Sequence, residues 1–160
     1  MALLKTYQIE RLVDIRTIPR SRHNPQFNDT ALANSLTAEQ LEYVPMQALG
    51  GLRHARKDSP NTGWRNESFR GYADYMQTTP FQDALDALIH MRNERRVAIM
   101  CAETLPWKCH RSLVADALNV HGVAAVEILS ESKFQMHRLT PFAEVNGLQI
   151  TYPPLQSTLL

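Results

Sequence analysis

The sequence predicts an α/β protein with an open, mainly parallel sheet and helices on both faces, in a Rossmann-like three-layer arrangement. Short apolar runs of strand length alternate along the chain with segments whose apolar residues recur at helical spacing. This alternation is typical of a doubly wound sheet, in which strands are followed by helices. A length of 160 residues suits one folding unit with a buried core, so we expect a single α/β domain over residues 1–160.

The first half of the chain predicts two strands, a helix and a long loop. Residues 9–16, in which apolar residues recur, are expected to form a buried strand, and residues 41–45 a short strand. A short helix is expected over residues 28–35, because an Asn-Asp pair at its start can cap the first turn. Residues 50–67 are rich in Gly, Pro and Asn, so we expect a loop, and a loop of this length usually serves a function.

The second half predicts a strand between two helices. A helix is expected from Thr79, which can act as the N-cap, with Pro80 at the first helical position and Gln82 placed for a capping box. The uninterrupted apolar run of residues 97–102 then predicts a central strand that is covered on both faces. A further helix is expected to begin at Arg111.

Three later elements complete the expected fold. The helix that begins at Arg111 ends at Gly122, a typical helix stop. Residues 123–129 predict the next strand of the same sheet, reached by a right-handed crossover, and residues 148–152 predict a terminal strand.

The composition is that of an ordinary globular protein. Hydrophobic residues make up 44% of the chain, and 17 basic against 16 acidic side chains leave a formal net charge of +1. No general attraction to nucleic acid or to a membrane follows from this balance. Apolar runs stay below the roughly 18 residues of a membrane span, and the first residues lack the pattern of a signal peptide, so we expect a cytoplasmic protein without a membrane partner.

Three unusual segments follow expected strands, at residues 14–22, 49–53 and 101–111. Loops that leave the carboxyl ends of neighbouring parallel strands converge on one crevice, where ligands bind. The first two segments are locally basic, which favours an anionic ligand. The alternative is that the arginines are solvated or pair with nearby acidic residues. The candidate substrate-binding residues are Asp14, Arg16, Arg20, Arg22, Gly50, Gly51, Arg53, Arg70 and Arg111.

The third segment contains the candidate catalytic residues. Cys101 ends the expected strand, and Cys109 and His110 immediately precede a helix that begins at Arg111. The positive end of a helix and neighbouring cations lower the pKa of a thiol and attract phosphate-like groups. Either cysteine can then act as nucleophile, with His110 or Glu103 carrying the proton.

Other interpretations of these residues stay open. Zinc could be bound by Cys101, Cys109 and His110, although the sequence lacks the closely spaced ligand pairs of most zinc sites, and we predict no cofactor. Cys101 could simply pack in the core. His137, which stands alone in its loop, is expected to be structural. The aromatic residues of the segment 68–76 are expected to pack in the core and leave Arg70 exposed.

Six short motifs stand out along the chain: Val-Asp-Ile-Arg at 13–16, Pro-Arg-Ser-Arg at 19–22, Gly-Gly at 50–51, Phe-Arg-Gly-Tyr-Ala-Asp-Tyr-Met at 69–76, Met-Cys-Ala-Glu at 100–103 and Cys-His-Arg-Ser at 109–112. With these motifs the chain resembles a family called domain of unknown function 488. The resemblance implies the α/β fold and the placement of the motifs, and it supplies no reaction. Family members usually begin with a further strand, which this chain is expected to lack.

Three hypotheses about function follow. The first is a thiol-dependent enzyme that acts on an anionic substrate, such as a phosphate-bearing small molecule, a nucleotide or a nucleic acid. The second is a module that binds a nucleotide or nucleic acid without catalysis, through the same arginines and exposed aromatics such as Trp64 and Trp107. The third is a structural or interaction domain in which the cysteine segment only fixes a loop to a helix. The sequence leaves the oligomeric state open.

Overall fold

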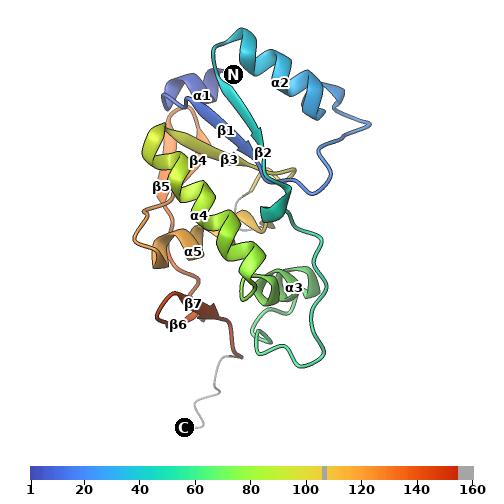
Figure 1. Ribbon diagram of the computed structural model, residues 1–160, viewed down its shortest axis with the longest axis vertical. Helices are drawn as coiled ribbons and strands as arrows, with labels where there is room; N and C mark the ends of the chain where they lie inside the picture. The colour runs from blue at the N-terminus through green and yellow to red at the C-terminus, as the bar shows by residue number, and fades with distance from the viewer. Residues whose placement is uncertain (106–107, 155–160) are drawn as a thin grey trace.

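Helices and strands alternate in mixed order along the structure, a computed structural model that describes residues 1–105 and 108–154 (Figure 1). Their order confirms an α/β protein. The elements are α1 (Ala2–Thr6), β1 (Arg11–Asp14), the 3-10 turn η1 (Pro25–Phe27), α2 (Asp29–Ala38), β2 (Glu42–Pro45), the 3-10 turn η2 (Gln47–Leu49), α3 (Glu67–Tyr75), α4 (Thr79–Glu94), β3 (Val97–Met100), α5 (Arg111–Val120), β4 (Val126–Ser130), β5 (Lys133–Met136), β6 (Glu144–Asn146) and β7 (Gln149–Thr151).

The main sheet has three parallel strands in the order β2-β1-β3. Asp14, the last residue of β1, lies opposite Pro45 and Met100, the last residues of the other two strands. The carboxyl ends of all three strands therefore meet at one edge of the sheet. The prediction that residues 97–102 form a central strand is wrong, because β3 is an edge strand with half-buried residues. The fully buried centre is β1.

Helices cover both faces of this sheet. On one face, Leu12 of β1 packs with Leu32 and Leu36 of α2. On the other face, Val13 packs in a larger cluster with Leu85 of α4, Val114 of α5 and residues of α3. Figure 1 shows the same arrangement, with α2 on one side of the sheet and α4 and α5 on the other. The prediction of a parallel sheet with helices on both faces is confirmed. With three strands, the sheet is too small to confirm a full Rossmann-like three-layer fold.

The strands after α5 form two separate antiparallel hairpins. β4 pairs with β5, and β6 pairs with β7. The prediction that residues 123–129 add a parallel strand to the main sheet is therefore wrong. An apolar run of strand length fits a parallel or an antiparallel neighbour equally well, so the pattern alone did not distinguish them.

The start of α4 differs slightly from the expected cap. Thr78 rather than Thr79 is the N-cap, with Pro80 in the first turn as expected. The Gln82 amide donates a hydrogen bond to the Met76 carbonyl at 2.9 Å, so it does not complete a capping box. The helix is fixed instead by its buried face, which includes Phe81, fully buried against Tyr72.

The expected loop between η2 and α3 is present, because residues 50–66 contain neither helix nor strand. The buried carboxylate of Asp74 organises it by accepting hydrogen bonds from the Ser59 hydroxyl at 2.6 Å and the Asn61 amide at 2.7 Å. The loop also passes very close to α3, where a Cβ on Gly71 would lie 2.3 Å from the Arg53 carbonyl oxygen. Only glycine fits this position without displacing the loop backbone.

Candidate active site at the carboxyl ends of the parallel strands

The three segments that follow β1, β2 and β3 meet at the imidazole of His110. Its Nε2 lies 3.3 Å from the carbonyl oxygen of Ile15, directly after β1. A Cβ added to Gly51, in the segment after β2, would come within 3.0 Å of His110 Nδ1. The ring also packs against Tyr72, with ring centroids 4.9 Å apart. Gly51 thus leaves the space that the His110 ring occupies.

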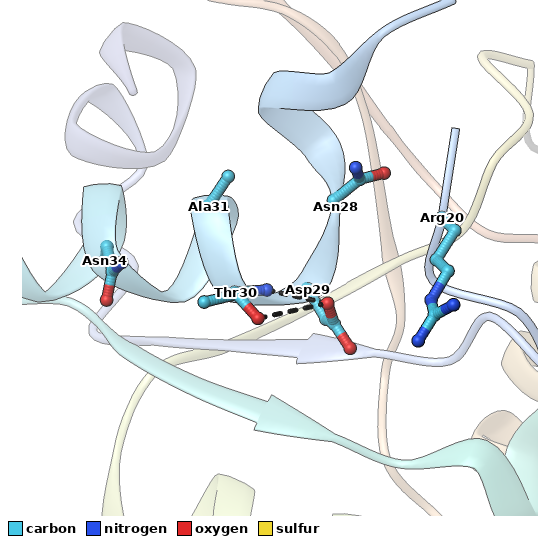
Figure 2. A pocket seen from close by; sticks show the side chains of 6 residues that line it. All are labelled: Arg20, Asn28, Asp29, Thr30, Ala31 and Asn34. Carbon is cyan, nitrogen blue, oxygen red and sulfur yellow. Dashed lines mark hydrogen bonds between the residues drawn. The ribbon is translucent and has the colours of Figure 1, made fainter. Parts of the chain in front are cut away.

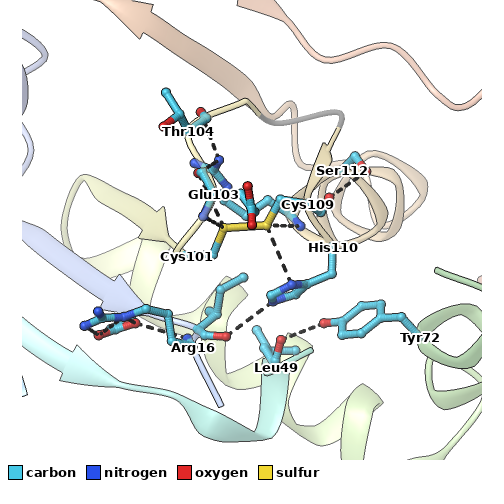
Figure 3. Close-up of a disulfide and its surroundings, with 12 residues drawn as sticks. Arg16, Leu49, Tyr72, Cys101, Glu103, Thr104, Cys109, His110 and Ser112 are labelled. Carbon is cyan, nitrogen blue, oxygen red and sulfur yellow. Dashed lines mark hydrogen bonds and ion pairs between the residues drawn. A yellow bond between two sulfur atoms is a disulfide. The ribbon is translucent and has the colours of Figure 1, made fainter. Parts of the chain in front are cut away.

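Two cysteines lie beside this histidine, and their Sγ atoms are joined in a disulfide (Figure 3). Cys101 follows β3 directly and is half-buried, whereas Cys109 is 3% exposed and lies just before α5. Both cysteines were expected to be thiols, whereas the structure pairs them. Their Cα atoms lie 7.5 Å apart, wider than the roughly 4.4–6.8 Å of most disulfides. The chemistry of the pair depends on its redox state, because only the dithiol contains a nucleophilic thiol.

Backbone N–H groups point at both sulfur atoms. The Glu103 amide lies 3.3 Å from Cys101 Sγ, and the Arg111 amide lies 3.5 Å from Cys109 Sγ. The Arg111 amide belongs to the first turn of α5, where the N–H groups and the helix dipole favour negative charge. In the reduced pair these groups favour a thiolate at Cys109, whereas the burial of this residue favours the neutral thiol.

His110 is arranged as a base toward Cys109. Because the Ile15 carbonyl only accepts hydrogen bonds, Nε2 carries the proton and Nδ1 has its lone pair free. Nδ1 lies 3.6 Å from Cys109 Sγ. Burial lowers the pKa of His110 below its ordinary value of 6.5, and the charge of Arg111 lowers it further. The imidazole is therefore neutral at neutral pH and able to accept a proton from the Cys109 thiol.

Arg111 ties the segment after β3 to α5. Its guanidinium donates hydrogen bonds to the backbone carbonyls of Glu103 and Thr104, the latter at 3.2 Å. Burial lowers the pKa of Arg111. Among the residues that the structure describes, its Nε has no hydrogen-bond partner and no carboxylate lies within ion-pair distance of the guanidinium. Arg111 thus forms no direct ion pair with a described residue, and Glu103 and Glu127 act on its charge only from a distance. Glu103 itself is exposed.

Arg16, expected to bind an anion, is instead neutralised within the protein. Its guanidinium donates to both carboxylate oxygens of Asp14, with Nε at 2.8 Å from Oδ1, and both side chains are buried. The Tyr43 hydroxyl donates to the same carboxylate at 2.8 Å. Burial and the neighbouring Asp14 raise the pKa of Tyr43 to about 12. The alternative interpretation, an arginine paired with a nearby acidic residue, holds for Arg16.

Arg53 and Arg70 also have partners inside the protein. Arg53 lies over the ring of Tyr75 at 3.7 Å from the centroid and donates to the Gly50 carbonyl at 3.2 Å. Arg70 is half-buried, against the expectation of exposure, and donates to the Trp64 carbonyl at 3.0 Å. Gly50 is needed for packing, since a Cβ there would lie 2.4 Å from the Thr17 hydroxyl.

Arg20 and Arg22 are exposed. Arg20 borders a shallow cavity of about 540 Å³ beside the first turns of α2 (Figure 2). The cavity wall is otherwise formed by short polar or small side chains, namely Asn28, Asp29, Thr30, Ala31 and Asn34. A second cavity of similar volume adjoins it and includes Tyr43 and Gln47. The structure thus separates the predicted arginines from one another instead of gathering them around one anion.

Within residues 1–105 and 108–154, no group of three or more His, Cys, Asp or Glu side chains is placed to hold a metal ion. The same part of the chain contains no helix with the length and hydrophobicity required to cross a bilayer.

Trp107, one of the aromatics in the binding hypothesis, lies outside the described residues, and Trp64 packs against Phe69, Phe142 and Tyr152.

Sequence reasoning missed a second polar cluster farther along α5. The Asp116 carboxylate is fully buried and accepts hydrogen bonds from His137 Nε2 and the Tyr152 hydroxyl, each at 2.8 Å. The Thr140 hydroxyl donates to it at 2.7 Å. His137 Nδ1 lies 2.7 Å from Glu127. The available signal was an acidic residue on the apolar side of a predicted helix, next to Leu113 and Ala117.

Fold and site together define an α/β protein with paired cysteines at the carboxyl edge of a small parallel sheet. Residues 1–118 match the model of the family described as Domain of unknown function DUF488. This match covers more than half of the chain, so the protein belongs to the DUF488 family. No match was found among curated proteins or among solved structures.

Proposed function

We propose that this protein is a thiol-dependent enzyme that acts on an anionic substrate at the carboxyl ends of its parallel strands. The observation that carries the proposal is the contact between the two sulfur atoms at the N-terminus of α5. His110 Nδ1 faces one of these atoms and backbone N–H groups point at both. These are the conditions that convert a thiol into a reactive thiolate at neutral pH.

The residues have distinct roles in this proposal. Cys101 is the more exposed sulfur and the one that a substrate reaches. His110 accepts the proton of Cys109, because its Nδ1 is unprotonated in the neutral ring. Arg111 and the exposed Lys108 supply positive charge next to the sulfur pair, which favours a substrate with an anionic group.

Thiol reactivity tests this proposal. The protein is reduced, and alkylation by iodoacetamide is followed against pH in Cys101→Ser and Cys109→Ser, with metal content determined on the same sample. We expect at least one cysteine to react with a pKa below the ordinary value of about 8.5. Arg20→Ala serves as a matched control that leaves alkylation unchanged, because Arg20 lies beside α2. Two inert thiols would contradict the proposal, and bound zinc would restore the metal interpretation.

A second candidate, a nucleotide-binding or nucleic-acid-binding module, is favoured by one observation. Arg20 and Arg22 are exposed and make no ion pair with any residue that the structure describes. Arg20 also borders the cavity of Figure 2. This candidate predicts oligonucleotide binding that weakens steeply with salt and is reduced in Arg20→Ala. Binding that is absent or insensitive to salt would exclude it.

We further propose that the protein works in the cytoplasm as a single domain without a resident cofactor. A reducing compartment keeps cysteine pairs largely as dithiols. The dithiol is the state that the proposed nucleophilic chemistry requires. Protease digestion of the full chain tests the domain assignment, because one domain yields no stable internal fragment.

A further inference from the structure

We propose that Cys101 and Cys109 act as a pair in thiol–disulfide exchange, in which Cys101 forms a mixed disulfide with the substrate and Cys109 resolves it. The inference rests on the proposed function, because it uses the same sulfur atoms. It adds the reaction and the substrate class, a small disulfide that carries anionic groups. The first support is direct contact of the sulfur atoms, which resolution of a mixed disulfide requires.

The direction of the reaction follows from the unequal exposure of the two cysteines. Cys109 is 3% exposed and is enclosed by the first turn of α5 and the His110 ring. Cys101 is half-buried at the end of β3, so an external disulfide reaches this sulfur first. The first covalent bond to the substrate therefore forms at Cys101.

Each sulfur atom has a backbone N–H beside it, the Glu103 amide at 3.3 Å from Cys101 Sγ and the Arg111 amide at 3.5 Å from Cys109 Sγ, and Cys109 has further groups around it. The Arg111 amide and the N-terminal end of α5 favour a thiolate at Cys109, and His110 Nδ1 lies 3.6 Å away to take the thiol proton. A stabilised thiolate is a good leaving group when a protein disulfide is reduced. Attack by an external thiol on Cys101 therefore releases Cys109, which makes the same pair competent in both directions.

Atoms and electrons balance in the exchange. The Cys101 thiolate attacks one sulfur of the substrate disulfide, and the first substrate thiolate leaves. The Cys109 thiolate then attacks Cys101 Sγ in the mixed disulfide, which forms the bond between the two cysteines and releases the second substrate thiolate. The dithiol loses two electrons, the substrate disulfide gains them, and the two cysteine protons end on the two released thiols. Two molecules of an external thiol reverse the reaction.

The test uses dithiobis(nitrobenzoate), a dianionic aromatic disulfide whose released thiolate is coloured. The reduced full-length protein is mixed with the reagent, and colour release and protein mass are followed together. We expect two coloured thiolates per protein with no retained adduct. Cys109→Ser should release one thiolate and keep an adduct on Cys101, and Cys101→Ser should react at least about tenfold more slowly.

Charge selectivity is tested with dithiodipyridine, an uncharged aromatic disulfide. We expect the preference for the dianionic reagent over the neutral one to exceed that of a reduced unfolded chain, and to shrink in Lys108→Glu, because the local charge changes sign. An equal preference in folded and unfolded protein would overturn the assignment of an anionic substrate.

Two results would overturn the exchange mechanism itself. One is release of two coloured thiolates with an adduct retained on each cysteine, which describes two independent thiols. The other is a Cys101→Ser variant that reacts as fast as the unmodified protein. Either result, found together with a depressed thiol pKa in the alkylation experiment, leaves the proposed thiol-dependent enzyme standing and removes only the exchange mechanism.

Discussion

Two histidines lie against helix α5, His110 at its N-terminus and His137 beside Asp116, and their surroundings differ in charge. At its N-terminus, His110 faces a sulfur atom, a backbone carbonyl and a nearby arginine charge. Farther along, the buried Asp116 of the helix binds His137, which also contacts Glu127. Burial lowers the pKa of His110. For His137, burial also lowers the pKa, but Asp116 and Glu127 together outweigh it and raise the pKa.

The comparison separates polar groups that hold the fold from polar groups that are available for chemistry. Both carboxylate oxygens of Asp116 accept hydrogen bonds, and both ring nitrogens of His137 contact carboxylates. At the other cluster, His110 Nδ1 keeps a free lone pair toward sulfur and Arg111 Nε is buried without a partner among the described residues. A satisfied network stabilises, whereas an unsatisfied one is a candidate site.

The largest effect should come from breaking the satisfied cluster. We expect Asp116→Ala to lower the free energy of unfolding by about 3–5 kcal/mol, because it leaves the buried His137 without one of its two carboxylate partners and removes the acceptor of Tyr152. Urea unfolding followed by the fluorescence of Trp64, which packs on Tyr152, measures this change.

Asp116→Asn is the matched control for that prediction. It keeps an acceptor oxygen and the side-chain volume, so we expect a smaller loss of stability than in Asp116→Ala. The alkylation rate of the cysteines in folded protein should change little in Asp116→Asn. A loss of stability below about 1 kcal/mol in both variants would show that the network is not the structural support that we describe.

A smaller effect, confined to reactivity, should come from the unsatisfied cluster. We expect His110→Gln to slow alkylation of Cys109 at neutral pH by about tenfold, because the amide can still donate to Ile15 but cannot accept the thiol proton. His121→Gln, at the C-terminal end of the same helix, should leave the rate unchanged. Equal rates in His110→Gln and the unmodified protein would remove His110 from the proposed mechanism.

The smallest effect is a dependence of stability on pH. The raised pKa of His137 means that its stabilising contribution is fully present below about pH 6.5, its ordinary pKa, and is lost as pH rises through the folded-state pKa. The stability advantage over His137→Gln should therefore shrink with increasing pH in urea unfolding experiments. An advantage that grows with pH would contradict the assignment. The lowered pKa of His110 acts in the opposite sense, because its contribution is lost as pH falls below 6.5.

Local patterns predicted the elements better than their assembly. The strands at residues 11–14 and 97–100 and the helices at 79–94 and 111–120 all lie where apolar spacing placed them. The position of β3 at the edge of the sheet and the pairing of β4 with β5 depend on contacts between distant residues. Those contacts leave no trace in the period of a single segment.

The site shows the same division. Convergence at the carboxyl ends followed from parallel pairing, so Gly51, Cys101, Cys109 and His110 were expected near one another, and the structure brings them together. Whether each arginine is free to bind an anion was not predictable, because this depends on which acceptor inside the protein its long side chain reaches. Arg16 reaches a carboxylate, whereas Arg53 reaches a carbonyl and an aromatic ring.

The hydrogen bonds of the buried Asp116 carboxylate extend beyond the part of the chain that matches the family. The family match ends at residue 118, and every cysteine, histidine and arginine of the sulfur site lies before that point. The partners of Asp116, which are His137, Thr140 and Tyr152, all lie after it. A chain shortened to residues 1–118 would keep the cysteines and His110, but Asp116 on α5 would lose the hydrogen bonds from His137, Thr140 and Tyr152.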